Sequence, residues 1–129
     1  MLNYKISKTV KESFDAIDSR IRETLSQNGF GIITEIDLKA TIKEKLDKEH
    51  RRHKILGACN PNIAYDSLNR DINVSLIMPC NVCVIDNEDG TTTVSAVETE
   101  QLLAIIDNER FIDIAREVDD LLKNAINSI

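Results

Sequence analysis

The sequence has 129 residues and a formal net charge of −6, with 42% hydrophobic and 29% charged residues. This length and balance exclude a disordered or fibrous protein and predict a single domain over residues 1–129. Aromatic residues make up only 4% and tryptophan is absent, which argues against a protein that stacks nucleic-acid bases on aromatic rings.

The start of the chain and its cysteines predict a cytoplasmic protein. Residues 1–5 contain no apolar run typical of a signal peptide, and no stretch of about 18 apolar residues occurs anywhere, so we expect no membrane partner. Three cysteines (Cys59, Cys80 and Cys83) are an odd number in a chain without an export signal. Reduced thiols are therefore expected, and not a disulfide framework.

Charge is unevenly spread along the chain. Residues 39–54 hold seven Lys or Arg against three acids, whereas residues 98–129 hold eight acids against three bases. Such a bipolar surface favours self-association and we expect a homodimer, although a solvated basic helix and a solvated acidic helix give the same pattern. The lysines of the basic segment are interleaved with acids, which is typical of ion pairs on a helix, so we expect no nucleic-acid partner.

The first half of the chain predicts two helices around a strand. Thr9 and Glu12 form a capping-box pattern ahead of apolar residues at helical spacing, which predicts a helix that ends at Asn28-Gly29. Residues 30–36 are short, apolar and β-branched, as in a strand. Asp37 then begins a second helix, in which apolar residues recur every four positions.

The second half predicts strands followed by helices. A brief strand is expected near residues 53–56, then a helix over 61–69 that Asn60 caps and Pro61 begins. Residues 72–78 alternate apolar and polar side chains, which predicts a strand. Residues 81–86 and 91–97 read as a hairpin around Asp89-Gly90, and the rest reads as helical with a break at 107–108. These elements predict the α+β class, with a mainly antiparallel sheet and flanking helices.

Two short motifs place a Cys-Asn pair where a strand meets a proline. They are residues 57–61 and residues 78–82. If the strand that ends at Gly57 pairs with a strand that ends at Met78, Cys59 and Cys80 lie close together at one rim of the sheet. We therefore expect a small pocket there in a ligand-binding or interaction module, with these candidate residues: Cys59, Asn60, Pro61, Pro79, Cys80 and Asn81.

These motifs also carry a family resemblance that covers nearly the whole chain. In order, they are residues 29–31, 35–37, 45–46, 54–61, 79–82 and 89–90. The sequence resembles the family known as domain of unknown function 302. The resemblance implies a curved antiparallel sheet with helices on one face, similar in fold to the half-repeat of the TATA-box-binding protein, and it implies no reaction. The chain departs from the family pattern at His53 and Cys83.

A thiol-dependent enzyme or a redox- or metal-linked protein is the alternative to a binding module. Cys59 or Cys80 would be the nucleophile and His53 the nearest base, but no group that orients this base is identifiable. Cys80 and Cys83 have the spacing of a redox pair, yet residues three apart on a strand point to opposite faces. A metal site would draw on His50, His53 and the cysteines at a spacing unlike that of paired zinc ligands, so no metal is assigned and the cofactor stays unknown.

Overall fold

The structure is a computed structural model that describes residues 4–106 and 109–129. The expected helix break at 107–108 lies outside the described residues. The elements in chain order are β1 (Lys5–Val10), α1 (Phe14–Gln27), β2 (Gly31–Asp37), α2 (Leu38–Leu46), β3 (His53–Cys59), α3 (Pro61–Arg70), the 3₁₀ helix η1 (Ile72–Ile77), β4 (Cys80–Asp86), β5 (Thr92–Val97), α4 (Thr99–Ile106), the 3₁₀ turn η2 (Glu109–Phe111) and α5 (Ile112–Asn127).

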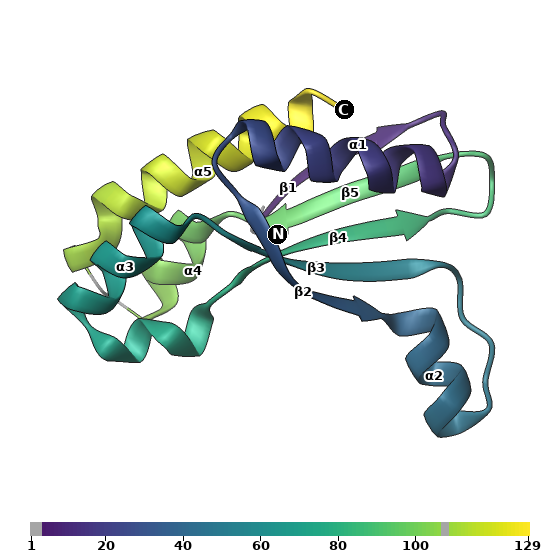
Figure 1. Cartoon of the computed structure of the whole chain (residues 1–129), viewed down its shortest axis with the longest axis horizontal. Helices are drawn as coiled ribbons and strands as arrows, with labels where there is room; N and C mark the ends of the chain where they lie inside the picture. Colours follow the sequence, from purple (N-terminus) through teal and green to yellow (C-terminus); the bar gives the residue numbers. More distant parts are fainter. Residues whose placement is uncertain (1–3, 107–108) are drawn as a thin grey trace.

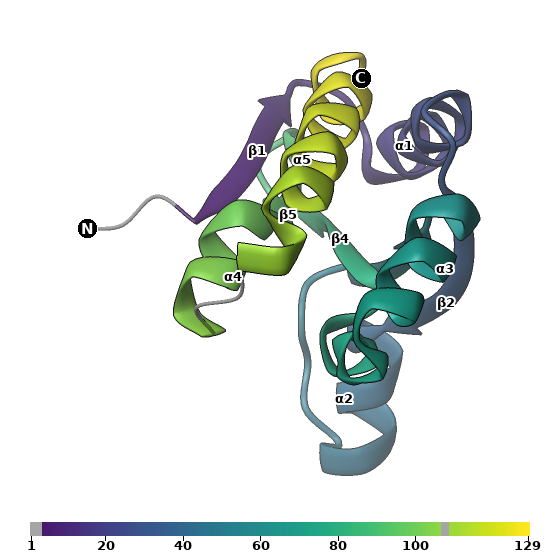
Figure 2. The same ribbon diagram turned by 90° about the vertical axis from the view of Figure 1, so that its left-hand side faces the viewer.

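The strands form one antiparallel sheet in the order β1-β5-β4-β3-β2. Helices α1 and α5 lie side by side over one face of this sheet (Figures 1 and 2). The core fills the space between them, because alternate residues of the strands point toward the two helices. The predicted α+β class and antiparallel sheet are confirmed. The fully buried side chains include Leu56, Val82, Val84 and Val94 from the sheet, Ile17, Ile21 and Leu25 from α1, and Leu122 and Ile126 from α5.

The opposite face of the sheet carries the other residues of the same strands, and we call it the open face. Cross-strand pairing places Ser7, Ser95, Cys83, Ile55 and Ile36 in one row across all five strands. These side chains are half-buried or exposed. A groove of about 630 Å³ runs along this face. The two faces therefore differ sharply in how much water reaches them.

The start of the fold differs from the prediction. Thr9 does not begin a helix but lies in β1, which pairs with β5 at the sheet edge. The capping residue of α1 is Ser13, whose hydroxyl accepts a hydrogen bond from the backbone N–H of Ala16 at 3.2 Å. Glu12 instead pairs with Arg20. A short edge strand with only one well-buried apolar residue, Ile6, gives little periodic signal, so the sequence pattern predicts the helix cap one turn too early.

The predicted strand at 72–78 is also wrong, because this segment forms the 3₁₀ helix η1. The alternation of apolar and polar residues in this segment does not follow burial, since Ile72 and Leu76 are exposed. The two residues that pack on the core are Val74 and Ile77, three positions apart, which matches three residues per turn. Asp71 begins this helix by accepting a hydrogen bond from the backbone N–H of Asn73.

Most other elements appear where the sequence predicts them. Asp37 caps α2, with its carboxylate accepting from the backbone N–H of Ala40 at 3.0 Å. The β4–β5 hairpin turns at Gly90, which has the positive φ of 88° that glycine adopts freely. Within the described residues, no helix has both the length and the apolar character that crossing a bilayer requires.

Candidate functional site

The first Cys-Asn motif is the corner between β3 and α3. Cys59 is the last residue of the strand, and Pro61 is the first of the helix, where the proline's missing N–H costs no hydrogen bond. The side-chain oxygen of Asn60 accepts a hydrogen bond from the backbone N–H of Ile63 at 3.3 Å. The predicted helix cap is therefore confirmed, and it fixes how α3 leaves the sheet.

The second motif is the corner between η1 and β4. The Met78–Pro79 peptide bond is cis, and Cys80 then begins the strand. Strand β4 pairs with β3 so that Cys80 lies opposite Ala58, the residue before Cys59. The two corners are neighbours at the same end of the sheet, as the sequence predicts, although the strand concerned begins at Cys80 and does not end at Met78.

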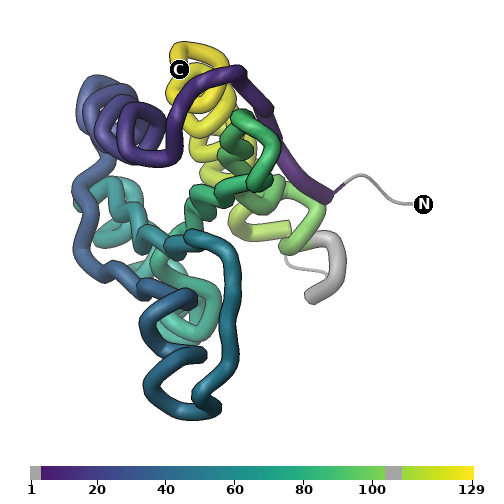
Figure 3. Tube along the Cα trace, turned by 90° about the vertical axis from the view of Figure 1, so that its right-hand side faces the viewer, coloured from purple at the N-terminus to yellow at the C-terminus, as the bar shows by residue number. Residues whose placement is uncertain are grey.

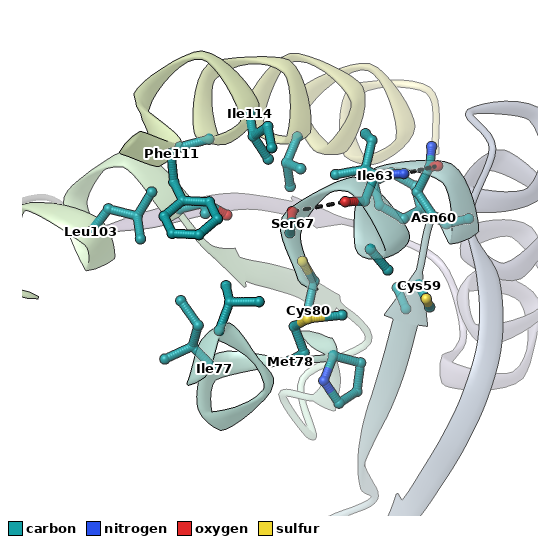
Figure 4. Close-up of a pocket in the computed structure, with 18 residues that line it drawn as sticks. Cys59, Asn60, Ile63, Ser67, Ile77, Met78, Cys80, Leu103, Phe111 and Ile114 are labelled. Atoms are coloured by element: carbon teal, nitrogen blue, oxygen red, sulfur yellow. Dashed lines mark hydrogen bonds between the residues drawn. The ribbon is translucent and has the colours of Figure 1, made fainter. Parts of the chain in front are cut away.

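A small cavity lies between these corners and the helices (Figure 4). Its volume is about 80 Å³, and elements β3, α3, η1, α4 and α5 all contribute to its wall. The lining is mainly apolar, and four of the six candidate residues belong to it, namely Cys59, Asn60, Pro79 and Cys80. The other two do not, since Asn81 lines the groove on the open face and Pro61 is exposed at the helix start. That any of the six binds a ligand stays a prediction.

Gly57 allows the two corners to approach one another. A Cβ atom at this position would overlap the hydroxyl of Thr34 on β2 and lie 2.8 Å from Cγ of Pro79, closer than real contacts permit. The other strand glycine, Gly31, would meet nothing closer than a carbonyl oxygen at 4.0 Å. Gly57 is therefore required for steric reasons, and it lets the ring of Pro79 rest on the backbone of β3.

The thiol of Cys80 has a low reactivity. Burial, with smaller contributions from Asp119 and Cys59, raises the pKa of Cys80 to about 11. Burial also raises the pKa of Cys83 above its ordinary value. Both thiols are therefore protonated at neutral pH. They are poor nucleophiles, because the thiolate is the reactive form. All three cysteines are free, and Cys80 and Cys83 lie on opposite faces of β4, which does not suit a redox pair.

Sequence reasoning missed Asp119, which is only 3% exposed. Its carboxylate accepts hydrogen bonds from the backbone N–H groups of Thr99 at 2.6 Å and Glu100 at 3.0 Å, at the first turn of α4. A carboxylate at this end of a helix is favourable because unpaired N–H groups and the positive end of the helix dipole lie there. Asp119 thus caps a helix far from it in sequence, and only an acid on the apolar face of α5 could have signalled this.

The histidines lie far from the two corners. His53 is at the opposite end of β3 from Cys59, six residues or about 20 Å away, so it does not act as a base for Cys59 or Cys80. Its Nδ1 lies 3.2 Å from Nε2 of His50, and burial together with His50 and Arg51 lowers the pKa of His53. Among the described residues, the histidines and cysteines form no cluster that could hold a metal ion. The acids that do gather, Glu98, Glu100 and Asp119, surround the helix end described above.

The basic segment pairs with acids, as its interleaved pattern predicts. Lys43 contacts Asp47 at 2.8 Å and Glu49 at 3.2 Å. Arg52 contacts Asp15 of α1 at 2.6 Å and also stacks over the ring of Phe14. These ion pairs tie the segment to neighbouring parts of its own fold. Because they are exposed, each contributes little to stability.

The fold and this end of the sheet define a small α+β domain with an apolar cavity at a sheet corner. Residues 6–129 match the family described as domain of unknown function DUF302, and the chain belongs to this family. It is also similar to a solved structure, the crystal structure of an uncharacterized conserved DUF302 protein from Bacillus stearothermophilus. That match covers 98% of each chain with a TM-score of 0.90 at 23% identity, which shows a shared fold. No curated protein matches.

Proposed function

We propose that the protein is a non-catalytic binding module, and that a small, mainly apolar molecule or group occupies the cavity between the Cys59 and Cys80 corners. The observation that carries the proposal is the convergence of two chain corners on one apolar cavity. Ligand sites are typically concave and apolar with a few polar groups that fix orientation. Here Asn60 and Thr99 are polar residues in an otherwise mainly apolar wall.

The size of the cavity limits what it can hold. A volume of about 80 Å³ is roughly half that of an apolar protein cavity known to take up benzene or xenon, which is about 150 Å³. The occupant is therefore a molecule or group of a few heavy atoms. Ser67 lines the cavity but its hydroxyl donates to the carbonyl of Ile63 at 2.7 Å, so this polar group is already satisfied.

Chemistry at the thiols receives less support than binding. A nucleophilic cysteine needs a lowered pKa or a neighbouring base, whereas burial raises the pKa of Cys80 and His53 lies at the far end of β3. The two carboxylate oxygens of Asp119 already accept hydrogen bonds from two backbone N–H groups. The thiol-dependent enzyme is therefore the weaker candidate.

Xenon is a suitable probe, because it is apolar and small enough for the cavity. We expect xenon pressure to shift the methyl resonances of Ile63 and Ile77, two residues of the wall. The Ala64→Leu variant fills the cavity and should abolish these shifts, whereas Ala16→Leu, the same change at an exposed position of α1, should keep them. Absent shifts in the parent protein, or equal shifts in Ala64→Leu, would overturn the proposal.

A native mass spectrum of the freshly purified protein tests the same proposal with natural ligands. We expect a small mass adduct that Ala64→Leu loses and that Ala16→Leu retains. The enzyme alternative predicts something different, namely a covalent adduct on Cys59 or Cys80 that survives denaturation. A covalent adduct would replace the binding module with the thiol-dependent enzyme.

A further inference from the structure

The groove on the open face has the size of an ordinary ligand site. Its volume of about 630 Å³ falls within the range of roughly 300 to 1,000 Å³ that is typical of such sites. Residues of β4, β5, η1 and α4 line it. Helices α1 and α5 lie on the other side of the sheet and leave this face uncovered (Figures 2 and 3). The groove therefore has room for a molecule much larger than the cavity accepts.

The lining of the groove is mainly apolar. Leu76 of η1 is 84% exposed and Tyr4 before β1 is 61% exposed, although both residues line the groove. Cys83 and Ile85 of β4 belong to the same lining and are half-buried. Covering such side chains removes apolar surface from water, which favours binding in proportion to the area that is covered. The apolar part of a ligand thus has a surface to pack against.

The charge of the groove differs from that of the whole chain. The sequence holds 22 Asp and Glu against 16 Lys and Arg, yet no acid occurs among the described residues that line the groove. The basic residues that line it are Lys5 and His53. Burial, with His50 and Arg51, lowers the pKa of His53, so Lys5 supplies the positive charge at neutral pH. Because a hollow lined by one sign of charge attracts the opposite sign, the groove favours an anion.

Hydrogen-bond donors for an anionic group lie at one end of the groove. Lys5 on β1 pairs with Val97 on β5. Asn81 on β4 is level with Val97, because the next residue, Val82, pairs with Ala96. The ammonium and the carboxamide thus belong to one row, two strand spacings or about 10 Å apart at the backbone. Lys5 also interacts with another group, but its ammonium has three N–H donors and can bind an anion as well.

We propose that the groove binds an amphiphilic carboxylate, that is, a molecule with one carboxylate on an unbranched aliphatic chain. Its carboxylate accepts hydrogen bonds from Lys5 and Asn81, and its chain lies along β4 over Cys83 and Ile85. From Asn81 to Ile85 the strand rises by four residues, or about 13 Å, which suits an extended chain. This site is distinct from the cavity between the two corners and does not depend on what occupies that cavity.

A series of simple carboxylates tests the class of ligand. Titration of the parent protein with hexanoate, octanoate and decanoate should shift the backbone amide resonances of Asn81 and Cys83. The affinity should rise about two- to fourfold for each added methylene, because the open groove covers the chain only in part. Octan-1-ol and octyltrimethylammonium have the same chain without the negative charge and should bind at least about fivefold more weakly than octanoate. Absent shifts, an affinity independent of chain length, or equal affinity for the alcohol or the cation would overturn the proposal.

Paired variants test the position of the ligand. Lys5→Gln should weaken octanoate binding at least about fivefold, whereas Lys11→Gln, the same change at an exposed lysine outside the groove, should not. Leu76→Gln should weaken it as well, and Leu46→Gln is the control, since Leu46 of α2 is 63% exposed and does not line the groove. A groove variant that binds octanoate as tightly as its control would contradict the proposed position.

The Ala64→Leu variant separates this site from the cavity. Ala64 lines the cavity but not the groove, so Ala64→Leu should abolish the xenon shifts and leave octanoate binding unchanged. Loss of octanoate binding in Ala64→Leu would place the chain in the cavity and would overturn the assignment to the groove. A parent protein that binds octanoate but not xenon would remove the cavity as a binding site and leave the groove in place.

Discussion

The two faces of one sheet differ more than the strand sequences suggest. On β4, Val82 and Val84 are fully buried beneath α1 and α5, while Cys83 and Ile85 on the open face remain half-buried. All four residues are apolar, so composition alone does not distinguish the faces. What differs is the helical cover, and this teaches that most of the stabilising burial of apolar side chains lies on the face beneath α1 and α5.

The largest expected effect is a cavity in the covered face. Leu56 is fully buried, and Leu56→Ala should lower the free energy of unfolding by about 2 to 5 kcal/mol. Ile85→Ala on the open face should cost clearly less, because water already reaches Ile85. Urea denaturation of both variants checks this. Equal losses would remove the distinction between the two faces.

The next effect concerns the glycine beneath Pro79. Gly57→Ala introduces a methyl group that overlaps Thr34 and Pro79, so we expect a loss of about 1 to 3 kcal/mol in unfolding free energy. Gly31→Ala is the control on β2, and its methyl group meets no atom closer than 4.0 Å. Adding Thr34→Ala to the first variant should recover part of the loss. Two glycine variants with the same denaturation midpoint would show that no close approach exists.

A smaller effect is expected at the helix cap beside the cavity. Asn60→Ala removes the hydrogen bond to the N–H of Ile63 and should cost about 0.5 to 2 kcal/mol in unfolding free energy. Asn60→Asp keeps an acceptor and should recover most of the loss. Thermal unfolding of the three proteins measures this. An Ala variant as stable as the parent would leave α3 without an effective cap.

The smallest expected effect concerns the rate at which a thiol reacts and not the free energy of unfolding. Because its pKa is raised to about 11, Cys80 should react with iodoacetamide far more slowly than an unfolded thiol near pH 8, and its rate should climb steadily toward pH 11. The pKa of Cys80 is raised because burial disfavours the charged thiolate. Peptide mapping after labelling identifies the modified residue. In denaturant all three thiols should react, and fewer than three would revive a disulfide.

The sequence predicted the elements whose signals are local. Asp37, Asn60 with Pro61, and Asp89-Gly90 each mark a helix start or a turn through their own hydrogen bonds or backbone preference, and each lies where expected. The segments predicted wrongly lack such a signal. Strand β1 is a sheet edge with little burial, and η1 alternates in sequence while packing with a period of three.

The candidate site was predictable only in part. The two Cys-Asn motifs indicate where the candidate site lies, because strand ends adjoin prolines there. That the two corners are neighbours depends on the pairing of β3 with β4. The remaining wall comes from residues such as Leu103 and Ile114, whose roles depend on how α4 and α5 fold back over the sheet. The role of Asp119 could not be predicted for the same reason, since its hydrogen-bond partners lie about 20 positions earlier in the chain.

The hydrogen bonds of Asp119 also hold one wall of the cavity in place. Two charge-assisted hydrogen bonds hold the first turn of α4 to α5, and each such bond contributes about 1.5 to 3 kcal/mol. The neighbouring wall, η1, is a single short 3₁₀ segment that ends with a hydrogen bond of 3.4 Å from Met78 to Ser75. The two walls of the cavity therefore differ in the hydrogen bonds that hold them: α4 is bonded to α5, whereas η1 is held at its end by a long backbone bond.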